Sequence, residues 1–161
     1  MVEKEEREIL LTKEGLQKLE SELEILKSVR REEVAERIKQ AIDFGDISEN
    51  SEYEDAKNEQ AFIEGRILIL EKTLKKARLM EEGEIRTDVV SLGSRVKLKE
   101  VKSGREVNVT VVSSAESKLK DGKISDESPV GRAIMGKTAK TTVSVEAPAG
   151  LIKYKILKVE K

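Results

Sequence analysis

The sequence predicts an α+β protein in two parts: an N-terminal antiparallel coiled-coil hairpin of two long helices, and a small antiparallel β domain with one short helix. Two observations carry this prediction. Apolar residues recur at steps of three and four through the first 80 residues, which is the spacing of amphipathic helices. After residue 93 they alternate with polar residues, as in half-buried strands. We therefore expect a hairpin over 1–80, a linker over 81–93 and a globular domain over 94–161.

The composition excludes several classes of function. Charged residues make up 39% of the 161 and aromatic residues 2%, which suits long, solvated helices. Because 31 basic residues face 32 acidic ones, any attraction to nucleic acid has to be local or indirect. The absence of cysteine and histidine excludes disulfides, thiolate zinc sites and histidine catalysis. The N-terminal MVEKEEREILL has no long apolar run, so we expect a cytoplasmic protein without signal peptide or membrane anchor.

The first helix is expected to begin after Thr12, a favourable N-cap, with Ile9 to Leu11 extended before it. Leucines at positions 16, 19, 23 and 26 then form one apolar stripe. The pattern stutters through residues 30–41, as expected of a four-residue insertion that unwinds a coiled coil without ending the helix. Gly45 suits the left-handed position at which a helix ends.

The second helix has a more regular heptad seam, which is a sign of a packed partner. Its members are Tyr53, Ala56, Gln60, Ile63, Ile67, Leu70, Leu74 and Ala77. A turn of a few residues between two such helices implies antiparallel neighbours, and helices of about 30 residues give a rod of about 45 Å. Because alanines 41 and 56 bury little area, we expect looser packing at the turn end of this rod.

The C-terminal part shows the signals of a sheet. Alternation predicts strands over 96–101, 107–111, 141–146 and 151–159, with turns at 102–105 and 147–150. Between the two hairpins, Ser128 and Pro129 stand at the cap and first position of a short helix that Gly136 stops.

The turn between the two helices is unusually acidic. No basic residue lies between Lys39 and Lys57, whereas the same stretch holds six carboxylates, Asp43, Asp46, Glu49, Glu52, Glu54 and Asp55. Asp46-x-x-Glu49 and Ser51-x-x-Glu54 have the spacing of capping boxes, but capping uses one or two acids and the others repel each other. The functional alternative is that Asp46 and Glu49 converge on Mg²⁺, with a partner supplying the remaining ligands.

Three segments carry a resemblance to a known family. They are GDISENSEYEDAKNEQAFIEGRI (Gly45 to Ile67), LTKEGLQKLESELEILKSVRREEV (Leu11 to Val34) and KISDESPVGRAIMGK (Lys123 to Lys137). The first resembles the coiled-coil tip of the Gre transcript cleavage factors of bacterial RNA polymerase, whose usual form is G-D-[LI]-x-E-N-x-E-Y. The likeness spans nearly the whole chain with order and spacing intact.

The resemblance implies a fold and a set of roles. In this family the hairpin enters the secondary channel of the polymerase, and an FKBP-like domain docks at the channel rim. The positions of Asp46 and Glu49 help to hold a catalytic Mg²⁺ shared with the polymerase, so that backtracked RNA 3′ ends are hydrolysed. The factor is then not an enzyme by itself, and we expect it to act as a monomer.

The resemblance also assigns roles to five further positions. Tyr53 and Lys57 match positions near RNA, although packing and ordinary solvation also explain them. Glu127, Ser128 and Pro129 match the segment that meets the polymerase rim. Two departures make this tip more acidic than is usual in the family: Ile42-Asp43 before the glycine motif and Glu54-Asp55 after the tyrosine.

Three other functions remain open from the sequence. An anti-cleavage Gre homologue would occupy the same channel and inhibit the polymerase. A prolyl isomerase would need an apolar, aromatic-lined pocket, whereas Tyr154 is the one aromatic residue after position 90. A plain coiled-coil adaptor would use its acids for solubility alone.

Overall fold

The computed structural model describes residues 8–45 and 50–161. They divide into two compact units. One is Glu14–Lys76, and the other combines the N-terminal residues up to Lys13 with Ala77–Lys161. Within the described part of the chain, no helix is both long and apolar enough to cross a membrane.

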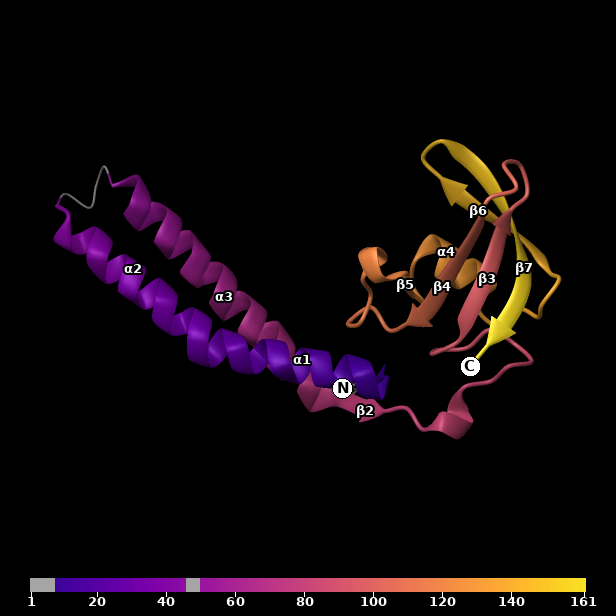
Figure 1. Cartoon of the computed structure of the whole chain (residues 1–161), viewed down its shortest axis with the longest axis horizontal. Coiled ribbons are helices and arrows are strands. Elements are labelled where there is room, and N and C mark those ends of the chain that lie inside the picture. Colours follow the sequence, from indigo (N-terminus) through magenta and orange to yellow (C-terminus); the bar gives the residue numbers. More distant parts are fainter. Residues whose placement is uncertain (1–7, 46–49) are drawn as a thin grey trace, which may run out of the picture. The chain divides into compact units, whose positions relative to one another are not determined.

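The helical unit is a hairpin of two antiparallel arms, as predicted (Figure 1). The first arm runs through α1 (Lys13–Ile25), a π-helical turn (Leu26–Arg30) and α2 (Arg31–Asp43). The second arm is α3 (Ser51–Lys76). At 26 residues its length is about 39 Å.

The π-helical turn is where the apolar pattern of the first arm breaks. The backbone N–H of Arg31 donates to the carbonyl of Leu26, five residues back, so the turn holds one residue more than an α-helical turn. Val34 is thereby brought inward, where it is 1% exposed and packs with Ile63 and Ile67. The helix continues through the break as predicted, but a wider turn absorbs the extra residue.

The predicted seam of the second arm is confirmed over most of its length. Ala56, Ile63, Ile67 and Leu70 are buried, and Tyr53, Gln60 and Leu74 are half-buried. The prediction for Ala77 is wrong, because α3 ends at Lys76. Ala77–Leu79 instead forms β2, which pairs in parallel with β1 (Ile9–Leu11). This pairing overrides a helical pattern that a single sequence cannot weigh against a distant strand.

Ion pairs bridge the two arms outside the seam. Arg31 donates two hydrogen bonds to Glu64, at 2.7 and 2.9 Å, and Arg66 donates two to Glu22, at 2.7 and 2.9 Å. The hydrogen bond from Arg31, opposed by some desolvation, holds the pKa of Glu64 below its usual value. Such paired guanidinium groups fix the register of one arm against the other.

The second unit contains a five-stranded sheet in the order β5-β4-β3-β7-β6. Its four long strands match the predicted ones and are listed by their bounds: β3 (Arg95–Glu100), β4 (Glu106–Val112), β6 (Thr142–Ala147) and β7 (Gly150–Glu160). β5 (Lys123–Ser125) was not predicted, and it lies parallel to β4, so the sheet is not entirely antiparallel. Three residues give too short a pattern for alternation to reveal.

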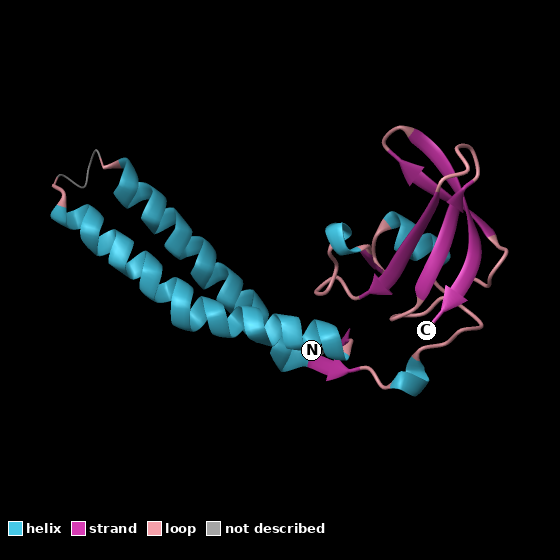
Figure 2. Ribbon diagram, viewed as in Figure 1, coloured by secondary structure: helices cyan, strands magenta, loops and turns pink. Residues whose placement is uncertain are grey.

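One face of this sheet forms the core. Val96, Leu98, Val111 and Ile156 point to that face and pack with Ile134 of the short helix α4 (Pro129–Ile134). Figure 2 shows α4 beside the strands. We call the opposite face, which carries the alternate residues of each strand, the outer face of the sheet.

Candidate functional site

The predicted metal-binding pair, Asp46 and Glu49, lies outside the described residues. The structure describes the residues on either side: α2 ends at Asp43, followed by Phe44 and Gly45, and the chain is described again from Asn50. Gly45 has a φ of +132°, in agreement with its expected place at a helix end. We call residues 41–45 and 50–55, the described residues on either side of the predicted pair, the frame.

Asn50 closes this frame with two hydrogen bonds. Its side-chain amide donates to the carbonyl of Ala41 at 2.7 Å, and its Oδ1 accepts from the backbone N–H of Tyr53 at 3.2 Å. Asn50 is therefore the N-cap of α3, and the predicted capping box on Ser51 is wrong because Ser51 is already helical. The sequence signal for this cap is the asparagine directly before the helix.

The side chain of Asn50 also provides a hydrogen-bond donor for a backbone carbonyl at the end of α2. Gly45 donates its N–H to Ile42 rather than to Ala41, so the carbonyl of Ala41 lacks the usual partner four residues on. Asn50 supplies that donor. One amide thus joins the last turn of α2 to the first turn of α3.

Carboxylates dominate the surface of this frame. Asp43, Glu52, Glu54 and Asp55 are all exposed, and within residues 8–45 and 50–161 none of them takes part in a salt bridge. Two arginines of the first arm, Arg30 and Arg37, both bind Glu59 of α3. Lys39 and Lys57, the basic residues nearest to the tip along the chain, are exposed.

The two residues predicted to lie near RNA differ in their surroundings. Lys57 is exposed and donates to Gln60 at 2.9 Å, so its ammonium group is held along α3 but remains open to solvent. Tyr53 is half-buried, in agreement with a place on the seam.

The acidic side chains predicted at the tip are of a type that suits a magnesium ion. Carboxylate oxygens are the hard ligands that Mg²⁺ prefers, and it is commonly bound by one or two of them together with water and phosphate oxygens. Among residues 8–45 and 50–161, however, no three acidic side chains are grouped so as to hold a metal. The described acids alone do not complete a metal site.

The predicted docking segment is brought together with two serines that the sequence did not reveal. Ser128 caps α4 by accepting from the N–H of Gly131 at 3.1 Å, and it donates to the carbonyl of Ser125 at 2.6 Å. Ser114 donates to Glu127 at 3.0 Å and is 2.7 Å from the hydroxyl of Ser125. These bonds hold Glu127 and the neighbouring Pro129 on the surface, where both are exposed.

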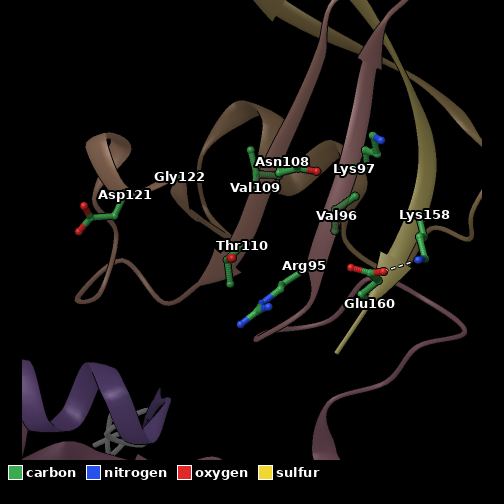
Figure 3. Close-up of a pocket in the computed structure, with 10 residues that line it drawn as sticks. All are labelled: Arg95, Val96, Lys97, Asn108, Val109, Thr110, Asp121, Gly122, Lys158 and Glu160. Atoms are coloured by element: carbon green, nitrogen blue, oxygen red, sulfur yellow. Dashed lines mark ion pairs between the residues drawn. The ribbon is translucent and has the colours of Figure 1, made fainter.

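The sheet also has a hollow of about 480 Å³ beside the ends of β3, β4 and β7 (Figure 3). Its lining is polar and charged apart from Val96 and Val109. Tyr154 packs against the core instead. Since no aromatic side chain lines this hollow, it lacks the apolar wall that a prolyl isomerase needs.

Comparison with known proteins identifies the family. The family model "Transcription elongation factor, N-terminal" matches residues 9–79, and "Transcription elongation factor, GreA/GreB, C-term" matches residues 85–161. The chain belongs to the GreA/GreB family of transcription elongation factors. It is accordingly a transcription elongation factor, and not an enzyme in its own right.

Individual relatives agree with this assignment. The chain is 83% identical to the transcription elongation factor GreA of Syntrophomonas wolfei, over 98% of this chain and 99% of that protein. It is 58% identical to the GreA of Thermoanaerobacter pseudethanolicus, over 95% and 98%. Among solved structures, GreA factor homologue 1 of Thermus thermophilus matches with 35% identity and a TM-score of 0.45, over 96% of this chain and 100% of that one.

Proposed function

We propose that this protein binds bacterial RNA polymerase in the cytoplasm, inserts its hairpin into the secondary channel, and stimulates cleavage of backtracked RNA 3′ ends. Family membership supports the role in elongation. The observation that carries the finer proposal is the frame around segment 46–49, in which Asn50 ties α2 to α3. A rigid frame is what a donated pair of ligands requires, because catalytic groups must be held in place before the partner is met.

In this proposal Asp46 and Glu49 supply carboxylate oxygens to a Mg²⁺ site that the polymerase completes. Magnesium bound there would polarise the phosphodiester and lower the pKa of a bound water. Sharing the ion explains why the factor alone has too few ligands: two carboxylates without phosphate oxygens bind Mg²⁺ weakly. The isolated factor is then inactive, and the activity belongs to the complex.

Lys57 is proposed to approach the phosphates of the RNA, since it is exposed and, among the described residues, it bonds to a neutral partner, Gln60. Tyr53 is proposed to support the tip from the seam. The exposed Glu127 and Pro129, fixed by the serine hydrogen bonds, are proposed to meet the rim of the channel. The factor is proposed to act as a monomer, with one hairpin in one channel.

The test is RNA cleavage in stalled, backtracked elongation complexes, with polymerase binding measured in parallel. Asp46→Asn and Glu49→Asn remove a charge from the proposed ligands. Asp43→Asn is the matched control, because Asp43 is an exposed acid of the same tip and has no salt bridge to any described residue. We expect the two ligand variants to bind the polymerase normally and to lose at least about 100-fold in cleavage rate, whereas the control retains most of its activity.

The same assay decides between cleavage and anti-cleavage. The exposed Glu54 and Asp55 at the start of α3 add negative charge, which weakens attraction for RNA phosphates and gives the inhibitory alternative a physical basis. If the unaltered protein binds the polymerase but suppresses its intrinsic cleavage, the proposal is wrong and the inhibitor is the correct assignment. If Asp43→Asn lowers the cleavage rate as much as the two ligand variants, the total negative charge of the tip, and not a pair of ligands, determines the activity.

A further inference from the structure

The outer face of the C-terminal sheet is strongly basic, although the whole chain is nearly neutral. Strand register assigns seven basic residues to this face: Arg95, Lys97, Lys99, Lys123, Lys153, Lys155 and Lys158. The same register assigns it three acids, Glu106, Glu146 and Glu160. Seven bases against three acids leave an excess of four positive charges on one side of a small domain.

The arrangement opposes like charges directly. Lys97 lies opposite Lys158, and Lys99 lies opposite Lys155, on the adjacent strands β3 and β7. Figure 3 draws both lysines of the first pair, together with the ion pair of Lys158 and Glu160. Like charges directly across a ladder destabilise a sheet. The stability of the domain therefore does not account for these lysines.

Acidic neighbours relieve only part of this repulsion. Lys97 is 3.2 Å from Glu106, and Lys158 is paired with Glu160. Among the described residues, Lys99, Lys153 and Lys155 have no salt bridge and are exposed. Their ammonium groups are open to an anion from outside.

The chemistry of the face favours nucleic acid over protein. Apart from the exposed Leu151 at the start of β7, the buried Val112 at the end of β4 and Leu157 at the bulge, the outward positions hold no apolar or aromatic side chain. Protein interfaces have an apolar core that is enriched in aromatic residues and arginine and depleted in lysine, and here six of the seven bases are lysines. Interfaces with DNA are more polar and far more positive, and lysine binds phosphate as a point charge.

The absence of aromatic side chains further favours a duplex. Proteins that hold single strands stack the bases on aromatic rings, and the outward positions of these strands offer none. Alternate residues stand about 7 Å apart along a strand and about 5 Å apart between strands. Such a grid presents several ammonium groups to a rigid phosphate backbone at once.

We propose that the outer face of the C-terminal sheet is a sequence-independent binding surface for double-stranded DNA. The surface uses phosphate contacts from Lys97, Lys99 and Lys155 and reads no bases. DNA binding by this face requires neither the hairpin tip nor RNA cleavage, so its test is independent of the function proposed above. In an elongation complex, such a surface adds a DNA contact to the contacts with the polymerase.

The test uses the full chain and a fluorescent duplex of about 20 base pairs, with binding followed by anisotropy from about 20 to 200 mM salt. Four net charges predict a slope of log K against log salt of about −3.6. The triple variant Lys97→Gln, Lys99→Gln, Lys155→Gln should lower the affinity at least about tenfold at low salt and reduce the slope by about 2.7. Lys99 and Lys155 are exposed and Lys97 is half-buried, and none of the three belongs to the hydrophobic core, so the variant is expected to fold, and thermal melting verifies this.

The control removes three exposed lysines from loops of the same domain, Lys102→Gln, Lys137→Gln and Lys140→Gln. It makes the same change in net charge and should retain most of the affinity and slope. If the control loses as much duplex affinity as the triple variant, the binding is not specific to the outer face and the proposal is contradicted. The absence of duplex binding by the unaltered chain would also contradict the proposal. Equally tight, lysine-dependent binding of poly-glutamate would contradict it too, and would show that the face binds acidic proteins.

Discussion

Replacing Asn50 with alanine tests whether one side chain holds the tip together. The change removes the N-cap of α3, worth about 1 kcal/mol, and the bond to the carbonyl of Ala41, worth about another 1 kcal/mol net. Together these lower the free energy of local opening by about 2 kcal/mol, or about 30-fold in the opening equilibrium. The helices below are held by Ile63, Ile67 and Val34, so the loss stays local.

Hydrogen exchange measures this effect directly. We expect the amides of Tyr53 and Glu54 to exchange about 30-fold faster in Asn50→Ala, with little change near Leu70. Asn50→Asp separates the two bonds, because its carboxylate still caps Tyr53 but has no N–H for Ala41. Asn58→Ala is the control, since Asn58 is an exposed residue of α3 with no side-chain hydrogen bond among the described residues. Unchanged exchange at Tyr53 in Asn50→Ala would refute the reasoning.

Three further perturbations follow from the packing. Gly131→Ala would place a Cβ 2.0 Å from the carbonyl oxygen of Ser125, so we expect a loss of at least about 2 kcal/mol in urea unfolding of the C-terminal unit; an unchanged midpoint would contradict this. Ile67→Ala empties a site that is 3% exposed and should cost about 2–5 kcal/mol, measured by thermal unfolding of the hairpin. Glu64→Gln tests the pair with Arg31, which lowers the pKa of Glu64. Because that pKa is lower folded than unfolded, the stabilisation is present at neutral pH and is lost as the pH falls through the folded pKa; the difference in Tm from the unaltered protein should vanish in acid, and a constant difference would exclude an ionic cause.

Sequence periodicity predicted the elements whose signal is long and local. The seam from Ala56 to Leu70 repeats over several turns, and each long strand of the sheet alternates over six or more residues. In both cases the face that is buried follows from the spacing alone. The cap of α4 at Ser128 was predictable for the same reason, since the serine, the proline and the helix are adjacent in the chain.

The features that sequence missed depend on partners distant in the chain. β2 is a strand because Ala77 lies opposite Ile9, 68 positions earlier, and β5 is one because β4 is beside it. The bond from Asn50 to Ala41 joins two helices, so nothing within either helix indicates it. The basic outer face likewise emerges when β7 is set beside β3, because neither strand alone shows that lysine faces lysine.

The central claim is that Asp46 and Glu49 supply ligands to a magnesium ion in the polymerase. The most direct measurement is the rate of RNA cleavage in backtracked complexes as a function of Mg²⁺ concentration, with saturating unaltered factor or Asp46→Asn. If the carboxylate is a ligand, the variant should need at least about tenfold more Mg²⁺ for its half-maximal rate, while Asp43→Asn follows the unaltered curve. Identical magnesium dependence in all three proteins, with polymerase binding intact, would contradict the claim.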